Sequence, residues 1–99
     1  MKQLLFSAYA QDDLLKIARY IALDSPVRAR SFVAELHKQC ELTRQFSNIG
    51  VAKPEYAEGL RMLAYQRYLI FFSATDDTVN IERVLHSARD LQQLFGSGK

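Results

Sequence analysis

The fold is decided by residues 60–91, which read LRMLAYQRYLIFFSATDDTVNIERVLHSARDL. Residues 68–72 form an uninterrupted apolar and aromatic run, and its short length and aromatic content favour a strand. Residues 75–78 have turn composition, and β-branched residues return in 79–85, so we expect a tight antiparallel hairpin at the centre of a small sheet. Residues 61–65 predict a third strand on the other side of 68–72.

The N-terminal half predicts a pair of antiparallel helices that covers one face of this sheet. Apolar residues recur at helical spacing in residues 8–23 and again in 26–46. Ser7 and Ser25 stand where N-caps belong, and the connection of two or three residues makes the helices antiparallel. The helix residues expected to face the sheet are Leu14, Ile17, Ile21, Phe32, Val33 and Leu36.

These elements predict an α+β fold with the order β-α-α-β-β-β and a mainly antiparallel sheet. The first strand, residues 3–6, is expected at an edge of the sheet, and residues 51–59 are expected to form a loop. Residues 89–95 predict a short last helix, and residues 96–99 have linker composition and predict a flexible tail. The chain is therefore expected to be a single domain over residues 1–95.

The composition is that of an ordinary globular protein, 48% hydrophobic and 24% charged. No window approaches the ~20 apolar residues that span a bilayer, so we expect no membrane segment. A single cysteine excludes an internal disulfide and fits a reducing cytoplasm. The net charge of +2 is too small to argue for nucleic-acid binding by itself.

Neither a metal site nor a cofactor is expected. The two histidines and the one cysteine lie far apart, without metal-ligand spacing, and no glycine-rich phosphate loop is present. Cys40 falls on the apolar stripe of the second helix, which predicts a core residue rather than a nucleophile.

Arg61 and Arg83 stand on predicted strands, and His86 stands at the end of the last one. Strict alternation would place Arg83 on an apolar strand face, which predicts a bulge, an edge position or a site on the sheet. His86 suits general acid–base work, but pairing with Asp90 at the strand end is the stronger expectation.

Two segments carry a resemblance to a known family. Arg61 is followed by the aromatic strand RYLIFF at 67–72, and later by IERVLHSARDL at 81–91. This pattern resembles toxins of the RelE/ParE superfamily of bacterial type II toxin–antitoxin modules, and it is most similar to the ParE branch. The element order is similar across nearly the whole chain.

The resemblance implies a protein that is neutralised by a cognate antitoxin and that inhibits DNA gyrase, with DNA contacted only through the antitoxin. One alternative is a RelE-like endoribonuclease that cuts mRNA on the ribosome with Arg61, Arg83 and His86. Ribonuclease relatives use a late tyrosine, whereas the last tyrosine here is Tyr68, so we expect a binding toxin rather than an enzyme. A second alternative is a non-toxic relative that only binds its antitoxin.

Two surfaces are expected to bind the partners. Strand neighbours point to opposite faces, so two helices cannot cover all the strand aromatics, and the rest should be exposed to the antitoxin. The expected antitoxin-binding residues are Tyr65, Tyr68, Phe71 and Phe72. The charged and apolar tail is expected to bind the target through Arg89, Asp90, Leu91, Leu94 and Phe95.

Overall fold

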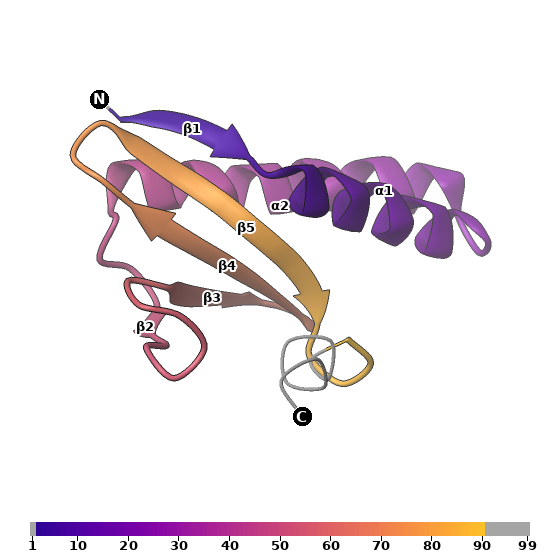
Figure 1. Ribbon diagram of the computed structural model, residues 1–99. Coiled ribbons are helices and arrows are strands. Elements are labelled where there is room, and N and C mark those ends of the chain that lie inside the picture. Colours follow the sequence, from indigo (N-terminus) through magenta and orange to yellow (C-terminus); the bar gives the residue numbers. More distant parts are fainter. Residues whose placement is uncertain (1, 91–99) are drawn as a thin grey trace.

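The computed structural model describes residues 2–90, in which two helices pack on one face of a five-stranded sheet (Figure 1). The predicted α+β class and the order of the predicted elements are confirmed. The elements are β1 (Gln3–Phe6), α1 (Ala8–Ala22), α2 (Pro26–Gln45), β2 (Val51–Ala52), β3 (Arg61–Tyr65), β4 (Tyr68–Ala74) and β5 (Thr78–His86).

The strands lie in the order β1-β5-β4-β3-β2, with β1 parallel to β5 and every other pair antiparallel. The predicted edge position of β1 is confirmed. The expectation of a loop throughout 51–59 is wrong at its start, because β2 pairs with β3 there. Gly50 permits this pairing: its φ is +79°, and a Cβ at that position would collide with the Met62 carbonyl. A strand of two residues leaves no alternation in the sequence by which to find it.

Both helices begin at the predicted caps. Ser7 Oγ accepts a hydrogen bond from the Ala10 amide at 2.9 Å, and Ser25 Oγ accepts one from the Arg28 amide at 3.1 Å. Pro26 follows Ser25 at the first position of α2, where its missing N–H costs no hydrogen bond. The helices run antiparallel beside each other, as expected from their short connection.

The main core lies between the helices and the sheet. Phe32 and Leu36 of α2 pack there against strand residues such as Ile70 and Phe72. Of the helix residues expected to face the sheet, Val33 is the exception. It lies half-buried in a groove on the outer side of the helical pair. The buried members of this core are Ala10, Leu14, Ile17, Phe32, Leu36, Cys40, Tyr68, Ile70, Phe72, Val79, Ile81 and Val84.

The opposite face of the sheet is also covered. Leu60, Phe71 and Leu85 form a second buried cluster, and the Tyr56 ring lies 5.8 Å from the Phe71 ring. The segment between β2 and β3 therefore folds back over the face that the helices leave open. Residues 87–90 form a turn after β5, while the expected helix at 89–95 and the tail at 96–99 lie almost entirely outside the described residues.

Candidate functional site

Arg83 lies at a β-bulge on the free edge of β5. Two of the three expected explanations of its position, a bulge and an edge position, are therefore both correct. Phe72 pairs with Ile81 and Phe71 pairs with Arg83, which leaves Glu82 as the extra residue. Strand β1 stops at the level of Ile81, so β5 has no neighbour on that side beyond the bulge. The bulge also explains why Val84 joins the helix-facing core, which strict alternation would not allow.

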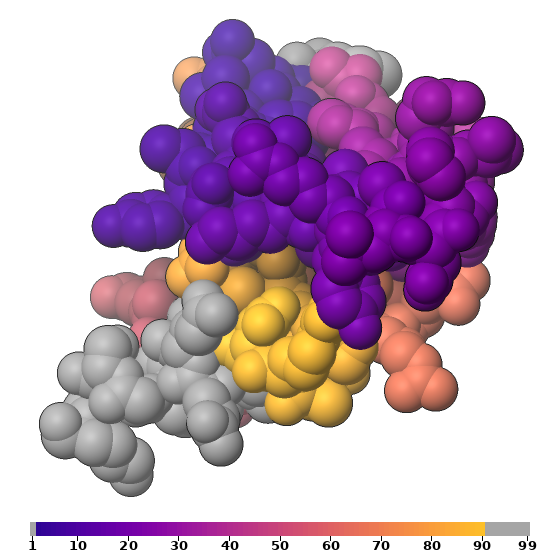
Figure 2. Space-filling model, turned by 90° about the vertical axis from the view of Figure 1, so that its right-hand side faces the viewer, coloured from indigo at the N-terminus to yellow at the C-terminus, as the bar shows by residue number. Residues whose placement is uncertain are grey.

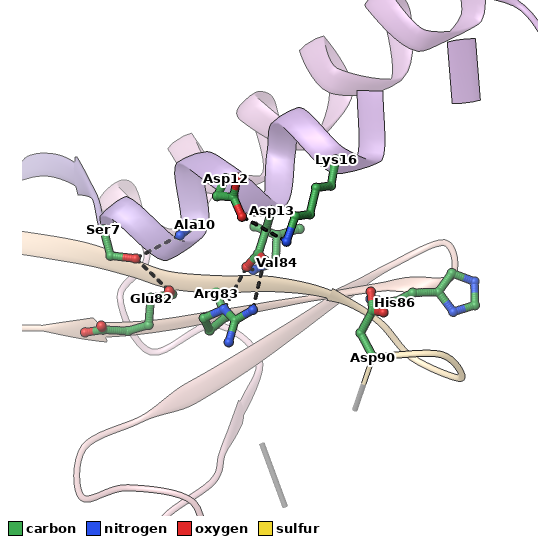
Figure 3. Close-up of polar contacts among 10 residues, drawn as sticks. All are labelled: Ser7, Ala10, Asp12, Asp13, Lys16, Glu82, Arg83, Val84, His86 and Asp90. Carbon is green, nitrogen blue, oxygen red and sulfur yellow. Dashed lines mark hydrogen bonds and ion pairs between the residues drawn. The ribbon is translucent and has the colours of Figure 1, made fainter. Parts of the chain in front are cut away.

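Asp13 of α1 caps this free edge (Figure 3). Its carboxylate accepts hydrogen bonds from Arg83 Nε at 2.8 Å, from Arg83 Nη2 at 2.9 Å and from the Val84 amide at 2.9 Å. Asp13 is only 7% exposed, and its hydrogen bond raises the pKa of the Arg83 guanidinium above the usual value. Ser7 adds a second link, because its hydroxyl donates to the Glu82 carbonyl at 2.7 Å.

Arg61 organises the chain segment that follows α2. Its guanidinium donates to the carbonyl oxygens of Asn48 at 2.5 Å, Ile49 at 3.1 Å and Gly50 at 3.1 Å. These carbonyls belong to the turn that leads from α2 into β2. Arg61 thus fixes the turn after the helix, and its side chain is directed away from β5.

His86 holds the turn at the end of β5. Its Nδ1 accepts hydrogen bonds from the amides of Ala88 and Arg89, both at 3.1 Å, and its own amide donates to Asp90 Oδ2 at 2.9 Å. The expected pairing of His86 with Asp90 is confirmed, although it runs through the His86 backbone. Burial, followed by the positive charge of Arg89, lowers the pKa of His86, while Asp90 acts in the opposite direction.

The structure does not bring the three candidate catalytic side chains together. Arg61 and Arg83 lie on strands on either side of β4, and their guanidinium groups bind opposite parts of the molecule. The His86 ring points away from the Arg83–Asp13 pair (Figure 3). Each of the three side chains makes contacts that fix the local backbone or an adjacent element.

The expected antitoxin-binding aromatics are mostly covered by the protein itself. Tyr68 is 6% exposed, and Phe71 and Phe72 are fully buried, so the expectation that they lie at the surface is wrong. The helices cover Tyr68 and Phe72, and the segment 53–60 covers Phe71. Tyr65 is half-buried, and its hydroxyl donates to Glu35 at 2.6 Å.

An open cleft is lined by residues of both helices, the β3–β4 turn and the turn 87–90. Figure 2 shows α1, the β3–β4 turn and the turn 87–90 meeting on one face of the molecule. The volume of the cleft is about 430 Å³. Arg89 stacks over the Tyr20 ring at 4.2 Å, and its Nη2 donates to the Tyr68 hydroxyl at 3.3 Å. Sequence reasoning missed this cleft because its residues come from separate elements. Its lining includes Tyr20, Arg28, Arg67, Tyr68, His86 and Arg89.

A shallow apolar groove runs along the outer side of the helical pair. Two adjoining hollows share Ala18 and Val33, and the second continues to β1. Leu15, on its wall, is 49% exposed. Small side chains form its floor. Sequence periodicity alone does not distinguish such residues from those of an ordinary helix surface, so it does not predict the groove. The first hollow is lined by Ala18, Arg19, Ala22, Pro26, Ala29, Arg30 and Val33.

Residues 2–90 include the single cysteine and both histidines of the chain. Cys40 is fully buried, as expected, and burial raises the pKa of its thiol to about 12. Within this part of the chain, His, Cys, Asp and Glu side chains form no group of three that is arranged to hold a metal ion. Within the same range, neither helix is long and apolar enough to cross a membrane.

The family profile for the "ParE toxin of type II toxin-antitoxin system, parDE" matches residues 4–91. The chain belongs to this family. The match runs from β1 through the turn after β5, so it includes the helical pair as well as the strands that carry the sequence resemblance. The predicted RelE/ParE resemblance, and its ParE branch, are therefore confirmed.

A solved structure supports the same assignment. The chain is similar to a structure described as "Chromosomal ParDE TA system from P. aeruginosa", with a TM-score of 0.72 and 25% sequence identity. The similarity covers 87% of this chain and 96% of that chain. No curated protein sequence matches significantly. The protein is a ParE-like toxin of a type II toxin–antitoxin system, which implies a cognate antitoxin as its partner.

Proposed function

We propose that this ParE-like toxin arrests growth by inhibiting DNA gyrase, and that its antitoxin relieves the inhibition by covering the toxin. Membership of the ParE family is the observation that carries the proposal. The positions of Arg61, Arg83 and His86 support a binding toxin over the ribonuclease alternative, because these side chains are engaged in separate parts of the fold.

The target-binding surface that we propose begins at the turn after β5. Arg89 and Asp90 are held there by the hydrogen bonds to His86, and Arg89 is exposed on the cleft side of the turn. Leu91, Leu94 and Phe95, which follow in the sequence, would add the apolar part of the surface. A basic and apolar patch is the composition that protein–protein contacts favour.

We place the antitoxin in the outer groove of α1 and α2, where a helix of the antitoxin would lie with its apolar side against Ala18 and Val33. Small side chains on the groove floor let another helix approach closely, and the exposed Leu15 offers apolar area to bury. Arg19 and Arg30 flank the groove and favour acidic residues on the antitoxin helix.

A gyrase assay tests the toxic activity. We expect the purified protein to inhibit supercoiling of relaxed plasmid by gyrase, and added antitoxin to restore it. A chain that ends at Asp90 keeps all the described strands but should lose the inhibition. Cleavage of ribosome-bound mRNA without gyrase inhibition would support the ribonuclease alternative instead. Absence of both activities, with antitoxin binding retained, would identify a non-toxic relative.

The groove is tested by placing a charge on its floor. Ala18→Glu adds bulk and a negative charge to the groove, and we expect it to weaken antitoxin binding at least about tenfold. Ala57→Glu is the matched control, because Ala57 is exposed in the segment that covers the opposite face of the sheet. Equal affinities of the two variants, measured by isothermal titration calorimetry, would contradict the groove assignment.

A further inference from the structure

The open cleft beside the turn 87–90 contains positive charge that no carboxylate of residues 2–90 neutralises. Arg28 of this cleft pairs with Glu35, with 2.7 Å between Arg28 Nη1 and Glu35 Oε2. Arg67 and Arg89 take part in no ion pair with a carboxylate in the described part of the chain, and both are exposed. Two guanidinium groups in the lining of the cleft therefore have no carboxylate partner within this part of the chain.

The cleft is held in place by its surroundings. Its floor includes the buried Tyr68 and Phe32, whose ring centroids lie 5.4 Å apart. The Ser87 amide donates to the Arg67 carbonyl at 2.8 Å, so the turn after β5 is fixed to the β3–β4 turn. Gln66, next to Arg67, has a φ of +56°, a left-handed conformation that is uncommon outside glycine and that fixes the direction of this turn.

Two carboxylates lie near the cleft, but each is bound to other groups and leaves the charge of Arg67 and Arg89 in place. Glu35 is occupied by Arg28 and by the Tyr65 hydroxyl. Asp90 accepts from the His86 backbone amide and does not line the cleft. The lining is otherwise aromatic: Tyr20 is 57% exposed and presents its ring beside Arg89.

We propose that this cleft is a phosphate-binding site for nucleic acid, in which Arg67 and Arg89 hold a backbone phosphate and the Tyr20 ring contacts the adjoining sugar or base. Guanidinium groups bind phosphate through paired hydrogen bonds, and an exposed aromatic ring beside them is the usual companion of a nucleic-acid contact. The inference deepens the proposed gyrase function, on which the choice of DNA as the nucleic acid rests. It departs from the expectation that DNA is contacted only through the antitoxin.

The site lies where the proposed target surface begins. Arg89 belongs both to the cleft and to the turn that we assign to target binding. A toxin that docks this turn on gyrase would bring the cleft toward the DNA that gyrase holds. The groove proposed for the antitoxin lies along the outer side of the helices. Arg67, His86 and Arg89 line the cleft and do not line this groove.

Direct DNA binding, measured without gyrase or antitoxin, tests this inference. Fluorescence anisotropy with a labelled DNA duplex of about 20 base pairs should show binding that weakens as NaCl rises from about 50 to 200 mM. Arg67→Gln should reduce the slope of log affinity against log salt by about 0.9, because one phosphate contact is lost. Over this salt range, that slope difference equals about a three- to fourfold change in affinity.

Lys38→Gln is the charge-matched control. Lys38 is exposed on α2 and does not line the cleft, so its loss should leave the salt slope nearly unchanged. A second readout is the imidazole NMR signal of His86. A phosphate between Arg67 and Arg89 offsets their positive charge, so DNA should raise the pKa of His86.

Several results would overturn the inference. These are no binding at low salt, an equal effect of Lys38→Gln and Arg67→Gln, or an unchanged His86 titration on DNA. Tighter binding to RNA of the same sequence would overturn the assignment to DNA, and displacement by poly-glutamate at equal charge would point to an acidic protein instead. DNA binding at the cleft without gyrase inhibition would support this site and refute the proposed function. Gyrase inhibition without DNA binding at the cleft would support the proposed function and refute this site.

Discussion

The bulge of β5 and the turn that follows this strand use similar charged side chains in opposite ways. At the bulge, Arg83 is bound through two nitrogens to the nearly buried Asp13. At the end of the strand, Arg89 lies open to solvent, stacked on Tyr20 without a carboxylate partner in the described chain. The first arrangement closes a strand edge against α1, and the second leaves positive charge facing an open cleft.

The comparison shows why an arginine on a strand does not by itself indicate a site. A charge that is paired, and nearly buried, maintains the fold, and removing one member leaves the other without its partner. A charge that is held in position but not neutralised is available to a ligand. Arg83 meets this criterion, and Arg61 is architectural for another reason, because its guanidinium binds three backbone carbonyls of the turn after α2. Arg67 and Arg89 are the candidates for binding.

The largest expected effect tests whether the open end stands on a rigid floor. Phe32 is 5% exposed and packs against Tyr68, so Phe32→Ala should lower the free energy of unfolding by about 3–5 kcal/mol. Urea unfolding measures the change. Val33→Ala on the neighbouring, half-buried position should cost clearly less. A loss below about 1 kcal/mol for Phe32→Ala would mean that the cleft has no packed floor.

The next effect concerns the closed edge of β5. Asp13→Asn keeps the shape of the side chain but removes the charge that Arg83 and the Val84 amide bind. We expect the free energy of unfolding to fall by about 2–3 kcal/mol. Asp12→Asn is the control, because the pair that Asp12 forms with Lys16 is exposed, and its loss should cost no more than about 0.5 kcal/mol. Equal costs would place Asp13 among ordinary surface charges.

A smaller effect is expected at the other architectural arginine. Arg61→Ala removes three hydrogen bonds to backbone carbonyls, and because these groups are partly accessible to water, the expected loss is about 1–2 kcal/mol. Arg61→Lys should recover little of it, since an ammonium group lacks the planar fork that reaches several carbonyls at once. Full recovery by lysine, in the same urea experiment, would show that charge alone matters there.

Local signals in the sequence were sufficient for most of the fold. The serine caps, Pro26 and the apolar periodicity predicted both helices nearly to their ends, and the run at 68–72 predicted β4. The family profile confirms the resemblance that the strand motifs suggested. The β2 strand was not predicted, because it depends on the close approach of the Gly50 backbone to β3 rather than on side-chain alternation.

The site was less predictable because it depends on distant residues meeting. The bulge at Glu82 was one of three open explanations, and the position of Asp13, which lies on α1, gave no hint that it would bind Arg83. Some of the strand aromatics were expected at the surface because two helices cover only one face of a sheet. The segment 53–60, which covers the other face, has no regular periodicity that would predict it. The assignments of Arg89 through Phe95 to target binding stay predictions.

The smallest expected effect is a pH dependence of stability at the open end. The pKa of His86 is lowered by burial first and then by Arg89, with Arg67 also contributing. A histidine in the unfolded chain has a pKa of about 6.5. At pH values between this pKa and the lower pKa of the folded protein, the unfolded chain binds more protons than the folded chain. The contribution of His86 to stability is therefore complete above about pH 6.5 and is lost as the pH falls through the lower, folded value.

His86→Asn isolates this contribution. An asparagine side-chain oxygen accepts hydrogen bonds from amides two and three residues on, as His86 Nδ1 does from Ala88 and Arg89, but it does not titrate. We expect the two proteins to unfold at similar urea concentrations at about pH 7.5, and the wild type to lose more stability than the variant by about pH 5. Carboxylates titrate in both proteins, so only the difference between the profiles reports His86. Parallel profiles would mean that the cations of the cleft do not reach the imidazole, and the contrast between the closed edge at the bulge and the open cleft after β5 would lose its electrostatic basis.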